Sequence, residues 1–175
     1  MVTRLAKIFI VFAFFITISS CDKQSCKKVT CGTGLECVTG KCVCADGTEG
    51  TGCTVASYVK YERNSATWIV SESCSPIAPF QSTNVYIQHD PASLQRLFIY
   101  NLFNGQCNPL VAYIYTNSNN EGNTLQIPSQ NQNCSGNTVS GTGSYDDATN
   151  RIYLQIDFTY NNGTDYQCTE TLYPQ

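Results

Sequence analysis

The residues best suited to acid–base or nucleophilic chemistry are few in this chain and do not form a recognisable catalytic motif. The single histidine, His89, lies in the segment His89-Asp90-Pro91-Ala92-Ser93, which is typical of an exposed turn. A serine nucleophile would be indicated by a setting such as a Gly-x-Ser-x-Gly elbow, and the sequence contains none. We therefore predict no catalytic residues, no cofactor and no enzymatic activity.

Metal binding is a separate question, because Asp146, Asp147 and Asn150 carry the oxygen ligands that calcium prefers. These residues lie between two predicted strands, where Asp and Asn are also the preferred turn formers, so we interpret the segment as a turn. The cysteines lack the Cys-x2-Cys pairs and histidine partners typical of zinc sites. We expect no bound metal.

The chain contains 11 cysteines, and their distribution indicates disulfides rather than free thiols. Six fall between Cys26 and Cys53, four are spread through the remainder, and the last is Cys21. Removing Cys21 from this odd number leaves ten, an even set available for pairing. Disulfides persist in oxidising compartments, so the count favours a protein that leaves the cytoplasm.

The first twenty residues have the layout of a secretory signal. Arg4 and Lys7 form a charged head, residues 8–18 are apolar, and two serines follow. A membrane-spanning helix needs about twenty apolar residues, and this run is shorter. An ordinary signal peptide whose first mature residue is a cysteine is one reading of this end.

The tetrad Ile18-Ser19-Ser20-Cys21 resembles the bacterial lipobox, in which the cysteine is lipidated and becomes the first residue of the mature chain. The resemblance implies a lipoprotein anchored in the outer membrane or at the cell surface, facing the periplasm or the exterior. Acyl chains contribute about 0.8 kcal/mol per buried CH₂, so two or three of them would hold the protein on the membrane. We expect a signal peptide at 1–20 and a lipid anchor and linker at 21–25.

The six clustered cysteines follow the pattern Cys26-x4-Cys31-x5-Cys37-x4-Cys42-x-Cys44-x8-Cys53. A segment this short cannot bury a sufficient core, so cross-links must supply its stability. The spacing, with Gly47 and Gly50 after the Cys-x-Cys pair, resembles the EGF-like family over residues 26–53. That resemblance implies the pairs Cys26–Cys37, Cys31–Cys42 and Cys44–Cys53. Thr48 departs from the family, which usually has an aromatic residue there.

The remainder of the chain is rich in Tyr, Thr, Ile and Asn, with turn clusters at short intervals, and this composition predicts an all-β domain. In the clearest strand, alternate residues from Ile152 to Tyr160 share an apolar face, which is typical of a half-buried antiparallel strand. Asn161-Asn162-Gly163-Thr164 then predicts a hairpin turn centred on Asn162-Gly163. The eight expected strands are 67–74, 84–88, 97–103, 111–116, 124–127, 138–145, 151–160 and 165–173.

Eight short strands joined by local turns predict an up-and-down meander that curls into a barrel or half-barrel. A disulfide between Cys74 and Cys168 would join the first strand to the last, and Cys107 and Cys134 would form the second bridge. This pairing is a hypothesis, and the two other pairings of four cysteines remain open.

Several segments of residues 57–175 resemble a domain described as lipocalin-like in lipoproteins of the Bacteroidetes group. The resemblance covers roughly residues 58–175, implies a β-barrel fold and brings no shared activity, and Ala66 stands near a position where that group usually has glycine. The segments that carry it are Tyr61-Glu62-Arg63-Asn64-Ser65-Ala66-Thr67-Trp68-Ile69-Val70-Ser71-Glu72-Ser73-Cys74, Leu125-Gln126-Ile127-Pro128-Ser129-Gln130, Val139-Ser140-Gly141-Thr142-Gly143-Ser144-Tyr145 and Cys168-Thr169-Glu170-Thr171-Leu172-Tyr173.

Charge and aromatic content limit the partners. Loss of residues 1–20 would leave eight basic against 13 acidic side chains, and this balance argues against nucleic acid as a partner. Exposed tyrosines such as Tyr153 could form an aromatic face for a protein or a glycan.

We therefore expect a non-catalytic binding module at the cell envelope. The alternative is a lipocalin-like carrier with a small apolar ligand in the barrel, which would need an open interior cavity.

Overall fold

The computed structural model describes residues 26–63, 66–76, 82 and 84–175. The expected signal peptide, Cys21 and the linker at 21–25 lie outside the described residues. In chain order the elements are β1 (Leu35–Val38), β2 (Lys41–Cys44), β3 (Thr48–Glu49), β4 (Val55–Ala56), α3 (Tyr58–Glu62), β5 (Trp68–Ser75), β6 (Tyr86–Asp90), β7 (Ser93–Tyr100), the 3₁₀ turn η2 (Leu102–Gly105), β8 (Leu110–Tyr115), β9 (Thr124–Gln130), β10 (Thr138–Asp146), β11 (Arg151–Thr159) and β12 (Asp165–Pro174).

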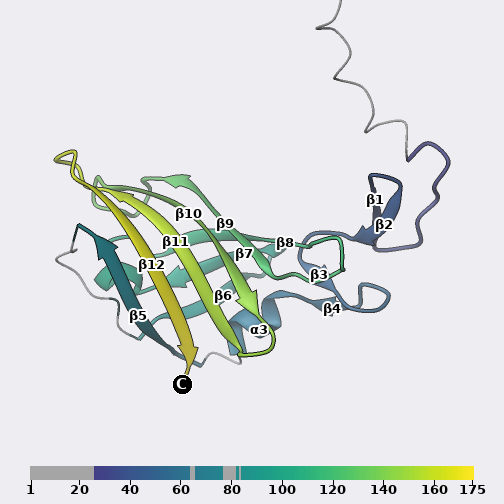
Figure 1. Cartoon of the computed structure of the whole chain (residues 1–175), viewed down its shortest axis with the longest axis horizontal. Coiled ribbons are helices and arrows are strands. Elements are labelled where there is room, and N and C mark those ends of the chain that lie inside the picture. The colour runs from purple at the N-terminus through teal and green to yellow at the C-terminus, as the bar shows by residue number, and fades with distance from the viewer. Residues whose placement is uncertain (1–25, 64–65, 77–81, 83) are drawn as a thin grey trace, which may run out of the picture.

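The larger part of the chain is one antiparallel sheet of eight strands, in the order β5-β12-β11-β10-β9-β8-β7-β6, curled into a half-barrel (Figure 1). The prediction of an all-β meander is therefore confirmed. Strands β5 and β12, the first and last strands of this sheet along the chain, pair along their length, from Trp68 opposite Pro174 to Ser75 opposite Gln167. The edge strands are β5 and β6, which meet at one bridge where the Trp68 N–H donates to the Val85 carbonyl (2.6 Å). The open side of the half-barrel thus lies between β5 and β6.

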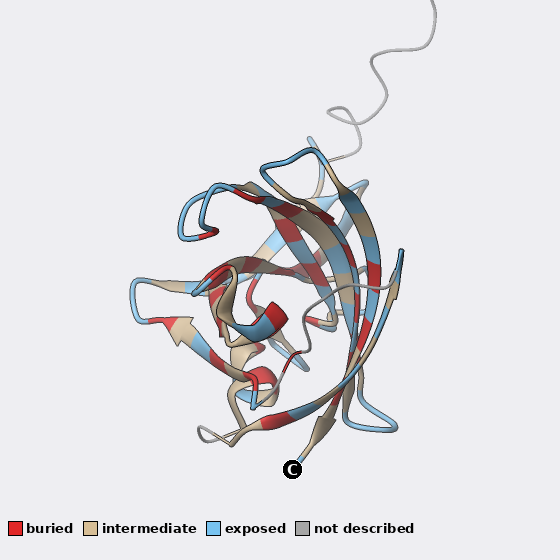
Figure 2. Cartoon of the chain, turned by 90° about the vertical axis from the view of Figure 1, so that its left-hand side faces the viewer, coloured by how far each residue is buried: buried red, intermediate tan, exposed pale blue. Residues whose placement is uncertain are grey.

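Buried and exposed residues alternate along the strands, as the red and pale blue bands in Figure 2 show. On β11, Ile152, Leu154 and Phe158 are fully buried, whereas Gln155 is exposed, so the half-buried strand is confirmed. Complete burial of an aliphatic or aromatic side chain of this size contributes about 1.5–3 kcal/mol. The interior side chains therefore hold the curl of the sheet together.

Two glycines of β10 allow the sheet to bend closely around its interior. A Cβ atom at Gly141 would lie 2.3 Å from the Gln155 carbonyl oxygen, and one at Gly143 would lie 2.7 Å from that of Tyr153. Neither distance is compatible with a side chain, so β10 can approach β11 this closely only with glycine at both positions.

A bulge in β9 is compensated by a side chain. The register between β9 and β10 shifts between Val139 and Gly141, next to Pro128, which has no N–H to donate. Beyond this point the Gln130 side chain takes over part of the pairing with β8: its Oε1 accepts from the Val111 N–H (2.9 Å) and its Nε2 donates to the Val111 carbonyl (2.8 Å).

Two local predictions need correction, and one element was not expected. The third expected strand, 97–103, runs too far: β7 ends at Tyr100, Asn101 has a φ of 64°, and the buried Leu102 and Phe103 belong to η2. The hairpin after β11 is centred on Asn161-Asn162, because the Gly163 N–H donates to the Tyr160 carbonyl and Gly163 itself takes a φ of 83°. Helix α3 was not expected, because nothing in the sequence pattern indicated it.

The disulfide-rich region, defined here as residues 26–56, forms two small hairpins, β1–β2 and β3–β4, at one end of the half-barrel (right in Figure 1). The second hairpin extends past Cys53, the expected end of the EGF-like region, to Ala56. Within residues 26–175, as far as the structure describes them, five disulfides are present, and they join the expected partners: Cys26–Cys37, Cys31–Cys42, Cys44–Cys53, Cys74–Cys168 and Cys107–Cys134.

Candidate binding sites

Helix α3 and strand β6 bring His89 into contact with a carboxylate. His89 Nδ1 lies 2.7 Å from Glu62 Oε1, and the His89 backbone N–H donates to the same oxygen (2.6 Å). The imidazole also stacks on Tyr58, with ring centroids 3.8 Å apart. Tyr58 and Glu62 are four residues apart on one face of α3, so this cluster holds the helix against the sheet.

The expectation that His89 is an exposed turn residue is therefore wrong. His89 lies within β6 and is half-buried, and the turn consists of Pro91 and Ala92. The Glu62 carboxylate orients the ring, an arrangement that general bases also use. His89 does not line the cleft at Glu49 and Lys60 or the hollow across β10, β11 and β12. Its contacts with Tyr58 and Glu62 instead hold α3 against β6.

A second pair of titratable groups faces the interior, where Glu72 of β5 lies directly opposite Glu170 of β12. Glu170 is fully buried, and its side chain faces that of Glu72, to which it hydrogen-bonds when one of the two carboxyls carries a proton. Burial raises the pKa of Glu170 to about 9, and the Glu72 carboxylate adds to the effect. Glu72 accepts hydrogen bonds from the backbone N–H (3.2 Å) and hydroxyl (2.8 Å) of Ser82. Glu170 is thus a neutral acid at pH 7.

This pair does not form a metal site. The only metal-like grouping among the described residues joins Glu170 to Cys74 and Cys168, and these two sulfurs are already bonded to each other. A disulfide offers no thiolate to a metal ion. Sequence reasoning missed the pair, although each glutamate lies two residues from a bridged cysteine and therefore on the same face of its strand.

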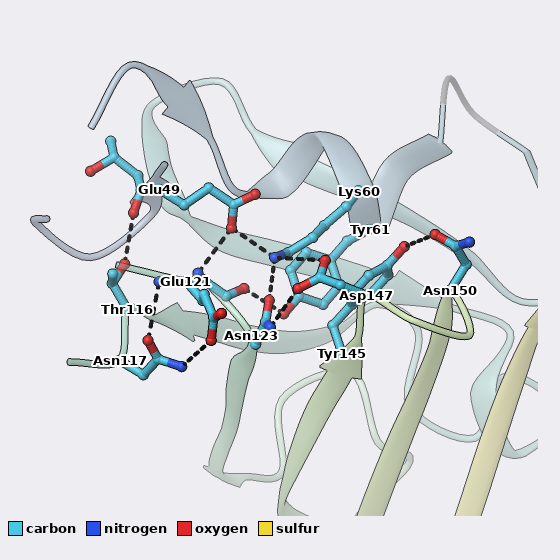
Figure 3. A network of polar contacts seen from close by, with 12 residues as sticks. Glu49, Lys60, Tyr61, Thr116, Asn117, Glu121, Asn123, Tyr145, Asp147 and Asn150 are labelled. Carbon is cyan, nitrogen blue, oxygen red and sulfur yellow. Dashed lines mark hydrogen bonds and ion pairs between the residues drawn. The ribbon is translucent and has the colours of Figure 1, made fainter. Parts of the chain in front are cut away.

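A network of polar contacts joins the disulfide-rich region to the sheet, and we call it the junction (Figure 3). At its centre, Lys60 Nζ donates to Glu49 Oε2 (2.7 Å), hydrogen-bonds Asn123 Oδ1 and lies 3.6 Å from Asp147 Oδ1. The same Glu49 oxygen accepts the Gly122 N–H (2.9 Å). Lys60 and Glu49 are both largely buried, so a single ammonium group links three segments of the chain.

The loop between β8 and β9 supplies the other half of the junction. The Asn120 side chain accepts the Cys44 N–H (2.8 Å), and its carbonyl accepts the Gly50 N–H (3.0 Å). The Thr116 N–H donates to the Asp46 carboxylate (2.9 Å). The sequence marks this Asn-rich loop only as turn-forming, and nothing in it signals which distant backbone groups its amides will bind.

A buried tyrosine extends the junction into the interior. The Tyr61 hydroxyl donates to the Gly122 carbonyl (2.8 Å), and the Trp68 indole N–H donates to the Tyr61 carbonyl (3.1 Å). Burial, together with the charges of Glu49 and Asp147, raises the pKa of Tyr61, which therefore stays a hydrogen-bond donor.

A cleft of about 350 Å³ opens beside the junction. Its polar walls are drawn from both sides of the contact: Glu49, Gly50, Thr51, Val55, Lys60, Asn119, Asn120, Glu121 and Asp147. Several of these groups are already bonded to one another, including Lys60 with Glu49, or to a near neighbour, as Glu121 is to Asn117 (2.8 Å). The cleft therefore offers few unused donors, and its contacts account mainly for the attachment of the disulfide-rich region.

A second hollow, of about 470 Å³, lies on the outer face of the sheet across β10, β11 and β12, and we call it the outer hollow. Pairing aligns Thr142, Gln155 and Thr169 in one cross-strand row, and Asp157 with Gln167 in the next. All five side chains are exposed. Within the part of the chain that the structure describes, none of them hydrogen-bonds another residue. Gly141, Ile156 and Cys168 complete the lining.

Other residues singled out from the sequence have simpler surroundings. Tyr153 lies on the outer face of β11 with 36% of its surface exposed, two residues from Gln155.

Asp146 accepts the Thr149 hydroxyl (2.6 Å) and the Ala148 N–H (2.9 Å), and these bonds lower the pKa of its carboxyl. Asp146 therefore caps a turn, whereas its neighbour Asp147 belongs to the junction.

The fold and these sites define an all-β protein in which a disulfide-stapled N-terminal region is attached to a curled eight-strand half-barrel. Comparison with models of known protein families finds no match for the chain, and no curated protein matches it either. Among the described residues, no helix has the length and apolar character needed to cross a membrane.

Proposed function

We propose that this protein is an exported bacterial lipoprotein that acts as a non-catalytic binding module at the cell envelope. The cysteine count carries the proposal. Ten of the 11 cysteines form five disulfides, and Cys21 is the one that remains. Five disulfides favour an oxidising compartment, and the remaining cysteine is the residue that the lipobox-like tetrad marks for acylation.

In this proposal the disulfide-rich region is an EGF-like spacer between the membrane and the half-barrel. Its pairing of first with third, second with fourth and fifth with sixth cysteine supports that assignment. The junction supports a fixed rather than a swinging attachment, because Lys60, Asn120 and Thr116 tie the spacer to the sheet through partly buried hydrogen bonds.

The packing of the interior favours binding at the outer surface over transport of an apolar ligand inside the barrel. One continuous cluster of buried side chains, including Trp68, Phe103, Ile114 and Phe158, occupies the space that a carrier would leave open. The fully buried carboxyl of Glu170 is also a poor neighbour for an apolar ligand.

The proposal is tested by the chemistry of residue 21. Mass spectrometry of the native protein should find Cys21 at the amino terminus with acyl chains attached, and the protein should fractionate with membranes. A Cys21→Ala variant should lose both properties while keeping all five disulfides. An unmodified amino terminus together with titratable free thiols would overturn the proposal.

A further inference from the structure

The outer hollow has the size and the donor set of a ligand site. Its volume of about 470 Å³ falls in the usual range of about 300–1,000 Å³ for small-ligand sites. The strands fix the backbones of its five polar residues, so Thr142, Thr169, Gln155, Gln167 and Asp157 present their side chains from a rigid base.

The chemistry of the lining narrows the class of ligand. Each glutamine amide carries N–H donors and an acceptor oxygen, and each threonine hydroxyl can both donate and accept a hydrogen bond. The Asp157 carboxylate can accept two O–H groups at once. The hydroxyls of a sugar ring are also donors and acceptors, and neighbouring hydroxyls can pair with the amide, hydroxyl and carboxylate groups of this lining. On the same face of β11, Tyr153 lies about 7 Å from Gln155 along the strand, where its ring offers a flat apolar surface to the C–H face of a sugar.

Other classes of ligand fit less well. The lining contains no Lys or Arg and carries one carboxylate, so phosphate-rich or sulfated polymers find no positive partner. Its exposed side chains are all polar, which disfavours lipids. Protein interfaces are usually centred on buried aromatic or Arg anchors, and the hollow has neither within its lining.

We infer that the outer hollow, with Tyr153 beside it, binds an uncharged glycan. Gln155, Gln167 and Asp157 hydrogen-bond the sugar hydroxyls, and Thr142 and Thr169 contact its edges. This inference rests on the proposed function, in which an envelope protein presents an outer binding surface, and it names the class of ligand.

The test uses the full oxidised chain in affinity electrophoresis against four uncharged polysaccharides (a dextran, a mannan, a β-glucan and a galactan), with heparin as the charged counterpart. At least one uncharged polymer should retard the protein, and heparin should not. Gln155→Ala, Asp157→Asn and Tyr153→Ala should each weaken retardation about tenfold or more. Gln88→Ala is the matched control, because Gln88 is an exposed strand glutamine on β6, outside the hollow, and it should bind like the wild type.

Three results would overturn the inference: no retardation by any uncharged polymer, retardation that the hollow variants leave unchanged, or retardation by heparin alone. Self-association in sedimentation experiments that the same variants abolish would also overturn it, because a second copy would then occupy the hollow. These failures are distinct from failure of the proposed function, since acylation of Cys21 is measured independently of sugar binding.

Discussion

The junction and the outer hollow contain the same kinds of side chain but use them in opposite ways. In the junction, amides and carboxylates of Glu49, Asn120 and Asn123 are bonded to other parts of the chain. In the outer hollow, the side chains of Gln155 and Gln167 are exposed and hydrogen-bond no other described residue. Buried polar groups must find partners within the protein, whereas exposed ones can exchange water for a ligand. The comparison separates polar groups that hold the fold from those available for recognition.

The largest loss of stability is expected where the disulfide-rich region contacts the sheet. Gly47 has a φ of +86°, and a Cβ there would lie 2.7 Å from the Leu94 carbonyl carbon and oxygen. Gly47→Ala should therefore lower the free energy of unfolding by about 3 kcal/mol, through steric conflict added to backbone strain. Urea unfolding with the disulfides intact measures the change.

Gly163→Ala is the matched control for this substitution. Gly163 has a similar φ of +83°, but a Cβ atom there would meet no other atom within 4 Å. It should show the backbone strain alone, at about 1 kcal/mol. If the two variants lost equal stability, the close approach of Gly47 to Leu94 would contribute nothing, and the disulfide-rich region would pack less tightly against β7 than the structure shows.

The interior supplies a third environment that sharpens the comparison, because the Glu170 carboxyl is fully buried and lies beside a second carboxyl, that of Glu72. Its pKa is about 9 in the folded protein against an ordinary value of 4.5. The folded state therefore binds a proton more tightly than the unfolded state. The resulting stability is fully present below about pH 4.5 and is lost as the pH rises towards 9.

Glu170→Gln should remove this pH dependence, because the amide stays neutral at every pH. At pH 8 the variant should be more stable than the wild type, and the difference should narrow by about 1.4 kcal/mol for each pH unit towards pH 5. Thermal and urea unfolding between pH 5 and 9 measure it, with the exposed Glu36→Gln of β1 as control. A constant difference across this range would show that Glu170 is ionised in the folded protein.

The contrast between the two regions also explains what could be predicted from the sequence. Alternation of apolar and polar residues depends on the two-residue repeat of a strand, which is local, so β11 and the other seven strands of the large sheet were predictable. Cysteine parity is likewise visible along the chain and indicated that ten cysteines pair. The EGF-like resemblance implied three of the pairs, and the meander topology supplied the hypothesis for the other two. The open edge between β5 and β6 was not visible, because it depends on how the whole sheet curls.

The polar sites were less predictable for a related reason. Glu49 and Lys60 are only 11 residues apart, but Gly122 and Asn123, which complete their network, come from a distant loop. His89 looked like a turn residue because Asp90 and Pro91 follow it, and the helix that buries it is too short to show a helical period. Of the outer hollow, only the neighbouring Tyr153 was singled out, because exposed Gln and Thr residues in strands carry no distinctive pattern.

An intermediate effect is expected from the centre of the junction. Lys60→Met keeps the length of the side chain but leaves the largely buried Glu49 carboxylate without its cation. The free energy of unfolding should fall by about 1–2 kcal/mol, which is less than for a completely buried pair because water still reaches both groups. Lys41→Met on the exposed face of β2 should change it by less than about 0.5 kcal/mol. Equal effects of the two changes would remove the energetic distinction between the junction and an ordinary surface.

The smallest effect is expected in the outer hollow, and it is the one that tests the comparison most directly. The double variant Gln155→Ala, Gln167→Ala should retain the wild-type free energy of unfolding within about 0.5 kcal/mol for each change, because neither side chain bonds another described residue. Circular dichroism melting and urea titration measure this, alongside sugar binding by the same protein. A loss of stability matching that of Lys60→Met would mean that these amides hold the strands together. The hollow would then be structural like the junction, and its polar groups would not be free for a ligand.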